Sequence, residues 1–159
     1  MDISQQLAFA VKEEIIRNVL KSHQRILVLG FSGTGKTTCT LRAVHGIGTP
    51  CYFSPEQASR HKADTLLPEI VLLTALPGIP PSGASQPILI IDDLTRLPQA
   101  ALEEVTALLK NPDHWFKIVL LSRMLLESKE LMPNIDVVVK MKEKTAEMMF
   151  SNLPLSDQK

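Results

Sequence analysis

An eight-residue segment at positions 30–37, Gly-Phe-Ser-Gly-Thr-Gly-Lys-Thr, has residue types and a spacing suited to binding phosphate. It matches the pattern G-x-x-x-x-G-K-[ST], in which each fixed residue has a separate physical role. The glycines permit backbone conformations that a Cβ atom forbids, so successive N–H groups can converge on an anion. Lys36 supplies a positive charge for the terminal phosphates, and the Thr37 hydroxyl group is a suitable Mg²⁺ ligand. The sequence therefore predicts a nucleotide-binding loop made of Gly30, Phe31, Ser32, Gly33, Thr34, Gly35, Lys36, Thr37 and Thr38, with nucleotide phosphates and Mg²⁺ as its ligands.

Two acidic residues, Asp92 and Asp93, directly follow an apolar segment at residues 88–91. If that segment is a buried parallel strand, the acids stand at its carboxyl end, where open α/β sheets bind their ligands. We expect Asp92 to be the Mg²⁺ partner of Thr37, and Asp93 to orient or deprotonate the attacking water. The alternative is that the pair caps the following segment, because aspartate is common at turns.

A second polar pair, Ser122 and Arg123, ends the apolar segment at residues 117–123. At a ligand-binding edge, Ser122 and Arg123 could sense the terminal phosphate, and the guanidinium group could stabilise charge that develops on it. The alternative for Arg123 is a solvated charge at a strand end, or a structural partner of a helix C-terminus. The candidate catalytic residues are therefore Lys36, Asp93 and Arg123.

Apolar segments that alternate with helical patterns would place these residues in a doubly wound parallel sheet between two layers of helices. We expect five strands, at residues 26–29, 50–54, 88–91, 117–123 and 135–141. We expect helices at residues 2–21, 37–44, 56 into the seventies, 98–110 and 142–150. Residues 77–87 are rich in proline, glycine and serine, which predicts a loop.

Length and composition indicate the number of domains and the general class of the protein. The 159 residues suit one domain, which we expect to span residues 1–150 and to be followed by a flexible tail at 151–159. Seventeen basic and seventeen acidic side chains balance, so the charge does not favour a dedicated nucleic-acid binder, although a local patch stays open. Cys39 and Cys51 lack metal-ligand spacing and are expected to pack as reduced thiols in a cytoplasmic protein. No apolar run is long enough to span a membrane.

Taken together, the three motifs resemble the P-loop ATPases of the AAA+ and STAND type. The resemblance covers residues 15–141 and implies a five-stranded sheet of order 5-1-4-3-2, numbered along the chain. The segment 92–110 is similar to clamp-loader subunits, the Asp-Asp pair looks like that of bacterial replication initiators of the AAA+ class, and the ending at 119–123 looks more like the STAND ATPases.

The chain departs from that family in two places. Residues 127–134 contain no arginine, whereas AAA+ rings commonly place there the finger that completes a neighbour's site. Residues 142–159 are too few for the helical lid domain of the family. The resemblance therefore implies a nucleotide-binding core alone, either a minimal protein or a fragment of a larger one.

The function expected from these features is that of an ATP-binding, slowly hydrolysing switch that acts on a protein partner or forms a homo-oligomer, with a role in DNA transactions left open. One alternative is a small nucleotide or metabolite kinase, although the loop at 77–87 contains no lysine or arginine for a lid. Another alternative is a nucleotide-binding adaptor without turnover. A GTPase is disfavoured, because the Asn-Lys-x-Asp motif is absent.

Overall fold

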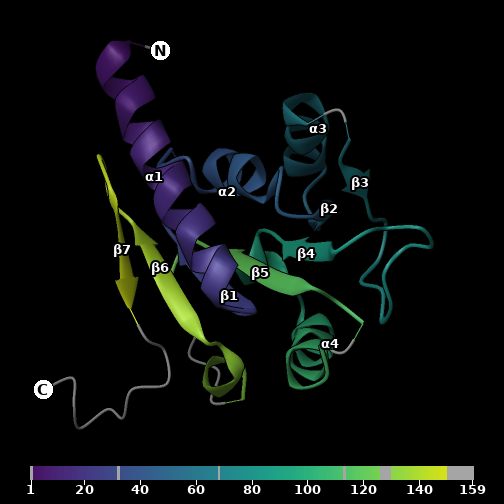
Figure 1. Ribbon diagram of the computed structural model, residues 1–159. Coiled ribbons are helices and arrows are strands. Elements are labelled where there is room, and N and C mark those ends of the chain that lie inside the picture. The colour runs from purple at the N-terminus through teal and green to yellow at the C-terminus, as the bar shows by residue number, and fades with distance from the viewer. Residues whose placement is uncertain (1, 32, 68, 113, 126–129, 150–159) are drawn as a thin grey trace, which may run out of the picture.

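The central feature of the fold is one mostly parallel β-sheet. A computed structural model describes residues 2–31, 33–67, 69–112, 114–125 and 130–149, and in these ranges the sheet has seven strands in the order β3-β2-β4-β5-β1-β6-β7 (Figure 1). The strands are β1 (Arg25–Leu29), β2 (Thr49–Phe53), β3 (Val71–Leu72), β4 (Pro87–Ile91), β5 (Lys117–Ser122), β6 (Val137–Met141) and β7 (Ala146–Met149). The α-helices are α1 (Ile3–Ser22), α2 (Lys36–Val44), α3 (Gln57–Leu66) and α4 (Gln99–Lys110). The described residues also form two 3₁₀-helices, η1 (Leu94–Arg96) and η2 (Met132–Asn134).

The sequence predicts five strands, and the structure has seven. The five expected strands neighbour one another as predicted, in the order β6-β1-β5-β4-β2, so the correction concerns the two edges of the sheet. At one edge, the helix expected from residue 56 into the seventies ends at Leu66, and the two-residue strand β3 pairs with Cys51 and Tyr52 of β2. This short strand uses backbone groups of β2 that would otherwise be unpaired at the edge.

At the other edge, the sequence predicts a helix at residues 142–150, and this prediction is wrong for the residues that the structure describes. β7 instead pairs antiparallel with β6, and the Lys142 N–H donates to the Thr145 carbonyl in the turn between them. Alanine, glutamate and methionine favour a helix locally, but β6 offers a row of unpaired backbone groups that a strand can satisfy. Phe150 and the expected tail at 151–159 lie outside the described residues.

The two faces of the sheet carry separate hydrophobic cores, because side chains alternate along each strand. One face packs against α1, α2 and α3, with Ile16, Leu41 and Ala63 among the buried contacts. The opposite face packs against α4 and the two 3₁₀-helices, with Val105 and Leu109 buried. The fold is therefore a three-layer α/β structure in which α2 and α3 lie side by side above the sheet (Figure 1).

Helix α1 begins at a capping box formed by Asp2 and Gln5 and packs against α2 and against β6 and β7 of the sheet. Its C-terminal half buries Val19 and Leu20, whereas Leu7 and Val11 in the N-terminal half are exposed. None of the helices within the described ranges is long and apolar enough to cross a membrane.

Both cysteines are buried free thiols, as the sequence predicts, with Cys39 in one core and Cys51 in the other. Burial raises the pKa of Cys39 and of Cys51 to about 11, because the thiolate would lose its hydration. Both therefore remain protonated and unreactive at neutral pH.

Candidate functional site

The motif at residues 30–37 runs from the end of β1 into the first turn of α2, as its sequence predicts. Gly35 is the N-cap of α2 in a left-handed conformation with φ of 84°, and no side chain hydrogen-bonds to the cap. The first N–H groups of a helix have no acceptor within the helix, so those of α2 are available to an anion. Gly33, with φ of 89°, is exposed and has no other group within 4 Å of the place where a Cβ would stand.

Two glycines of the loop are also required by close packing. A Cβ atom on Gly30 would lie 2.6 Å from Thr34 Oγ1, and one on Gly35 would lie 2.8 Å from the Phe9 ring. The Gly30 N–H donates to the carbonyl of Ser122 at 3.0 Å, which joins the start of the loop to the end of β5. The loop is therefore held between α1 on one side and the sheet on the other.

The central contact of the site joins two segments that are 55 residues apart. The Thr37 hydroxyl donates to Asp92 Oδ2 at 2.8 Å, and the Tyr52 hydroxyl donates to the same oxygen at 2.6 Å. The Asp93 N–H donates to the other oxygen, Oδ1, at 2.7 Å. Asp92 is 2% exposed, and this burial raises its pKa even though all three hydrogen bonds act in the opposite direction. Burial beside the Asp92 carboxylate likewise raises the pKa of Tyr52, which keeps its phenol protonated as a donor.

Asp93 follows the end of β4 but does not continue its extended conformation. Its φ of 53° and ψ of 45° lie in the left-handed region, where it is the N-cap of η1 without a side-chain capping bond. The Ser54 hydroxyl, at the end of β2, donates to Asp93 Oδ2. This turn brings Asp93 onto the same side as Asp92, whereas a continuing strand would have placed the two side chains on opposite faces.

These groups border one cavity of about 200 Å³ at the carboxyl ends of β1 and β4. It is lined by Phe31, Gly33, Lys36, Thr37, Ser59, Lys62, Asp92 and Asp93. Six of the eight carry a charge or a hydroxyl group suited to phosphate or to a divalent cation: Lys36, Thr37, Ser59, Lys62, Asp92 and Asp93. The cavity therefore combines the start of α2 and two lysines with two carboxylates.

Sequence reasoning missed Ser59 and Lys62, which reach this cavity from α3. They are three residues apart and therefore share a face of the helix. No motif marks them, because α3 is placed over the site by its packing against α2 and β2. Their proximity to the loop could not be inferred from their position in the sequence.

The other predicted site residues occupy varied places. Thr34 donates its hydroxyl to the Phe31 carbonyl at 2.7 Å and thereby stabilises the loop turn. Thr38 is buried in the first turn of α2, and the Phe31 side chain is 69% exposed at the rim of the cavity. Ser32 lies outside the described residues, as do residues 127–129 of the arginine-free segment.

Ser122 and Arg123 adjoin the loop from β5 but are not among the residues that line the cavity. The Ser122 hydroxyl is buried and donates to the Met124 carbonyl at 2.7 Å, so it is used in the turn after the strand. The Arg123 side chain is exposed. The sensor role of both residues and the catalytic role of Arg123 stay predictions.

A second cavity of about 200 Å³ lies behind the loop and shares Gly33 with the first. It lies between the N-terminal half of α1 and the turn after β6, and it is lined by Ser4, Gln5, Ala8, Phe9, Lys12, Gly33, Glu143 and Lys144. A ligand that crosses the loop at Gly33 could therefore occupy space on both sides of it.

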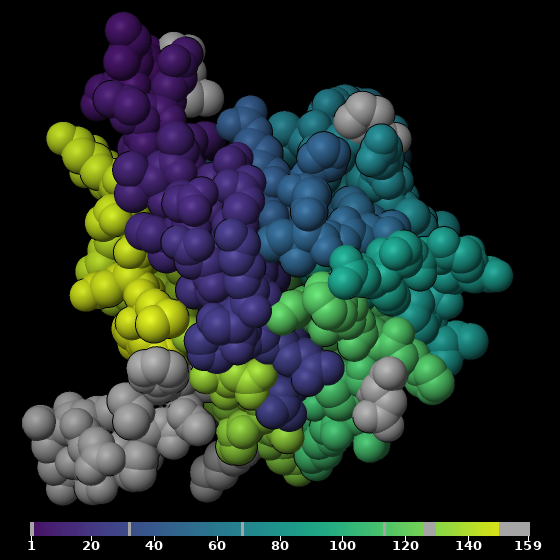
Figure 2. All heavy atoms as spheres, viewed as in Figure 1, coloured from purple at the N-terminus to yellow at the C-terminus, as the bar shows by residue number. Residues whose placement is uncertain are grey.

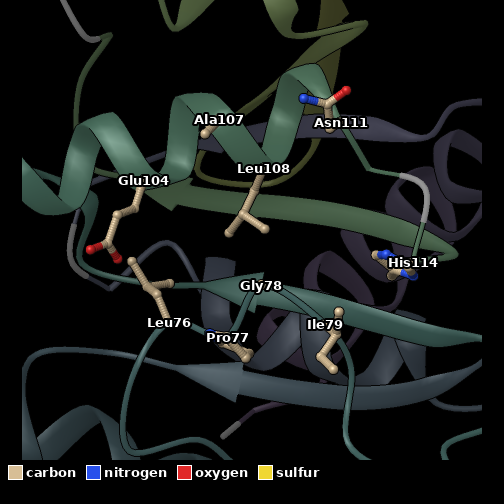
Figure 3. Close-up of a pocket in the computed structure, with 9 residues that line it drawn as sticks. All are labelled: Leu76, Pro77, Gly78, Ile79, Glu104, Ala107, Leu108, Asn111 and His114. Carbon is tan, nitrogen blue, oxygen red and sulfur yellow. The ribbon is translucent and has the colours of Figure 1, made fainter.

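A larger cavity, of about 570 Å³, lies away from the loop. Figure 3 shows it between α4 and the loop at residues 76–79, with Leu108 pointing from α4 toward the loop. Its wall is mainly apolar, and its polar residues, Glu104, Asn111 and His114, are exposed. It shares no lining residue with the two cavities at the loop.

Comparison with known proteins found likeness only among solved structures: no protein-family model and no curated protein matches the chain. RuvB of Thermotoga maritima, described as a Holliday junction branch migration motor, is 17% identical, with a TM-score of 0.49 over 84% of this chain and 46% of that chain. A RuvB variant is 15% identical, with a TM-score of 0.46 over 87% and 44%. PCH-2 of C. elegans is 16% identical, with a TM-score of 0.34 over 86% and 41%. This chain spans less than half of each of these structures, and its function is therefore argued from its own residues.

Proposed function

We propose that this chain binds ATP together with Mg²⁺ at the cavity beside the phosphate loop, and hydrolyses it slowly as a switch that acts on a protein partner. The observation that supports this most directly is the 2.8 Å hydrogen bond from Thr37 Oγ1 to Asp92 Oδ2. It brings the hydroxyl group at the end of the phosphate motif to a buried carboxylate on a different strand, which is the pairing that a nucleotide-bound Mg²⁺ needs.

The donor groups fit Mg²⁺, which prefers oxygen ligands and is usually bound by one or two carboxylates together with phosphates. Thr37 and Asp92 offer such oxygens at one point of the cavity wall. Within the described ranges, no group of three or more His, Cys, Asp or Glu side chains could hold a metal ion alone. We therefore expect the nucleotide phosphates and water to supply the remaining ligands of the ion.

The residues of the chain have separate tasks in this proposal. The N–H groups at the start of α2 and the Lys36 ammonium group bind the phosphates, and Lys62 adds a second positive charge from α3. Asp93 orients the water that attacks the terminal phosphate, with Ser54 fixing the carboxylate through Oδ2. The cavity behind Gly33 provides space for the base and the sugar.

The proposed turnover is slow because no arginine lines the cavity among the described residues. Phosphoryl-transfer enzymes that rely on an arginine finger lose roughly 10³–10⁵ in rate without it. A partner protein or a second copy of the chain would supply the missing charge, which makes hydrolysis depend on assembly. Because hydrolysis would then be fast only in the assembly, the site is suited to a switch.

A non-hydrolysing adaptor is the second candidate, and one observation favours it. The Asp93 carboxylate is held by the Ser54 hydroxyl, and in a purely structural role this contact would fix the turn after β4. In that case nucleotide binding alone would change the surface that a partner contacts.

The proposal is tested by isothermal titration with ATP, ADP and GTP in the presence of Mg²⁺, together with a phosphate-release assay on the same sample. We expect ATP and ADP to bind and GTP to bind more weakly. Lys36→Ala removes the loop's own cation and should weaken ATP binding by tenfold or more, about 1.4 kcal/mol. Lys110→Ala, at the exposed C-terminal end of α4, is the control. Equal ATP affinity in the wild type and in Lys36→Ala would refute the proposal.

A further inference from the structure

Lys12 of α1 is a buried lysine whose position the proposed function does not by itself explain. Its side chain is 1% exposed, and Nζ donates to the carbonyl of Thr34, in the phosphate loop, at 2.8 Å. The Phe9 ring lies 5.5 Å from Nζ. Burying an ammonium group is costly unless an opposite charge accompanies it.

No carboxylate within the described ranges forms an ion pair with Lys12. The two acids that follow it on α1, Glu13 and Glu14, both pair with Arg17 instead. The turn after β6 brings Glu143 to the cavity that Lys12 borders, but Lys144 accompanies it and adds the opposite charge. The positive charge of Lys12 is thus enclosed against the loop without a negative charge of its own.

Lys117 is the second buried lysine among the described residues and serves as a comparison. It is 9% exposed, donates to the His23 carbonyl at 2.8 Å and lies 5.1 Å from the Phe116 ring. These contacts match those of Lys12 closely, but Lys117 also has a favourable electrostatic interaction with the Asp136 carboxylate. It stands at the start of β5, at the opposite end of that strand from the loop.

The contacts of Lys12 belong to a wider attachment of α1 to the phosphate loop. The Phe9 ring fills the space where a side chain on Gly35 would stand, and the Phe9 carbonyl accepts from the Cys39 thiol of α2. Figure 2 shows α1 lying at the surface between β7 and α2, so these contacts reach the loop from an outer helix. One face of α1 therefore holds the loop from behind, on the side of Thr34 and Gly35.

We propose that Lys12 is a positioning residue of the phosphate loop, and that the phosphates of the bound nucleotide are the negative charge for which its buried ammonium group is held. The hydrogen bond from Lys12 to the Thr34 carbonyl fixes the loop in its phosphate-binding shape. The positive charge of Lys12, which lies behind the loop, attracts the phosphates. This inference rests on the proposed nucleotide binding and assigns α1 a direct part in it. A buried charge kept for a ligand lowers the stability of the free protein and raises affinity for the ligand.

The test compares Lys12→Met with Lys117→Met, which removes the charge of the matched lysine far from the loop. Methionine fills a similar volume without a charge or a donor. We expect Lys12→Met to weaken both ATP and ADP binding by about tenfold in isothermal titration, and to leave the melting temperature of the nucleotide-free protein unchanged or higher. Lys117→Met should leave both affinities unchanged. Lys12→Arg keeps the charge and a donor for the Thr34 carbonyl, and this variant should retain most of the affinity.

The outcomes separate this inference from the proposed function. If the wild type binds no nucleotide, the proposed function itself fails. If the wild type binds ATP and Lys36→Ala does not, but Lys12→Met binds as tightly as the wild type, only the role of Lys12 is overturned. An equal loss in Lys12→Met and Lys12→Arg, each titrating with a stoichiometry near one, would overturn the role of the charge. A lower melting temperature with unchanged affinity would assign Lys12 to structural packing.

Discussion

The backbone and the side chain of Asp93 have separate roles. Its left-handed conformation turns the chain after β4, and its carboxylate accepts from Ser54 while bordering the cavity. Asparagine tolerates the left-handed region as well as aspartate does, so Asp93→Asn removes the charge and keeps the turn. The substitution therefore isolates the chemistry of the side chain from its effect on the backbone.

We expect Asp93→Asn to lower ATP turnover by about a hundredfold, in line with the loss of a general base, and to leave ATP affinity nearly intact. Phosphate release and isothermal titration on the same preparation measure the two effects. Asp64→Asn, an exposed acid on α3, is the control. Wild-type turnover combined with a lower melting temperature would show that Asp93 acts only as a structural partner of Ser54.

Lys62 allows a residue-scale prediction based on charge. Its side chain borders the cavity from α3 and is exposed, so its effect should be modest and screened by salt. We expect Lys62→Met to weaken ATP binding by about fivefold at low ionic strength and to weaken ADP binding less. Titrations at two salt concentrations check this, with Lys21→Met in the last turn of α1 as the control. Equal losses for ATP and ADP would place Lys62 away from the terminal phosphate.

At the scale of elements, Asp136 joins β1 to the start of β6 at the end of the sheet away from the loop. Its carboxylate accepts from the Arg25 guanidinium group at 2.7 Å and from the Arg25 N–H at 2.9 Å. Partial burial alone would raise the pKa of Asp136, but the hydrogen bonds and the charge of Arg25 outweigh it and lower the pKa below its usual 3.8. The contact thus favours the ionised form in the folded chain.

A pKa that is lower in the folded state means that the stabilisation is complete above the usual value and is lost as the pH falls through the folded value. Asp136→Asn should therefore cost about 1 kcal/mol at pH 7, which lowers the melting temperature by about 2–4 °C. The difference from the wild type should shrink as the pH falls below 3.8. Thermal unfolding across this pH range measures it, and a difference that stays constant down to pH 3 would exclude the ionised contact as its cause.

At the scale of the whole molecule, the described residues supply the phosphate loop, the acids and two lysines, but no arginine at the cavity. We expect the isolated chain to turn over ATP more slowly than about once per second, because an arginine finger accounts for roughly 10³–10⁵ in rate. Phosphate release measured at several protein concentrations tests this. A faster rate that does not depend on concentration would indicate a self-contained enzyme instead of a switch.

The sequence by itself determined the parts that depend on local pattern. Residues 30–37 set the course of the phosphate loop, because glycines are required at its positive φ angles and close contacts. The apolar runs placed the five inner strands, and the pairing of Thr37 with Asp92 followed because parallel strands end at one edge of the sheet. These features need only neighbouring residues and the rule of strand order.

Only the tertiary structure decided which distant groups meet at the site and how the sheet ends. Residues 146–149 became a strand because β6 needed a partner, against the local preference for a helix. Lys62 and Lys12 reached the loop because α3 and α1 pack over it, and no spacing in the sequence encodes that approach. The surroundings of these two lysines depend on which helices pack over the loop, so their roles could be recognised only in the folded chain.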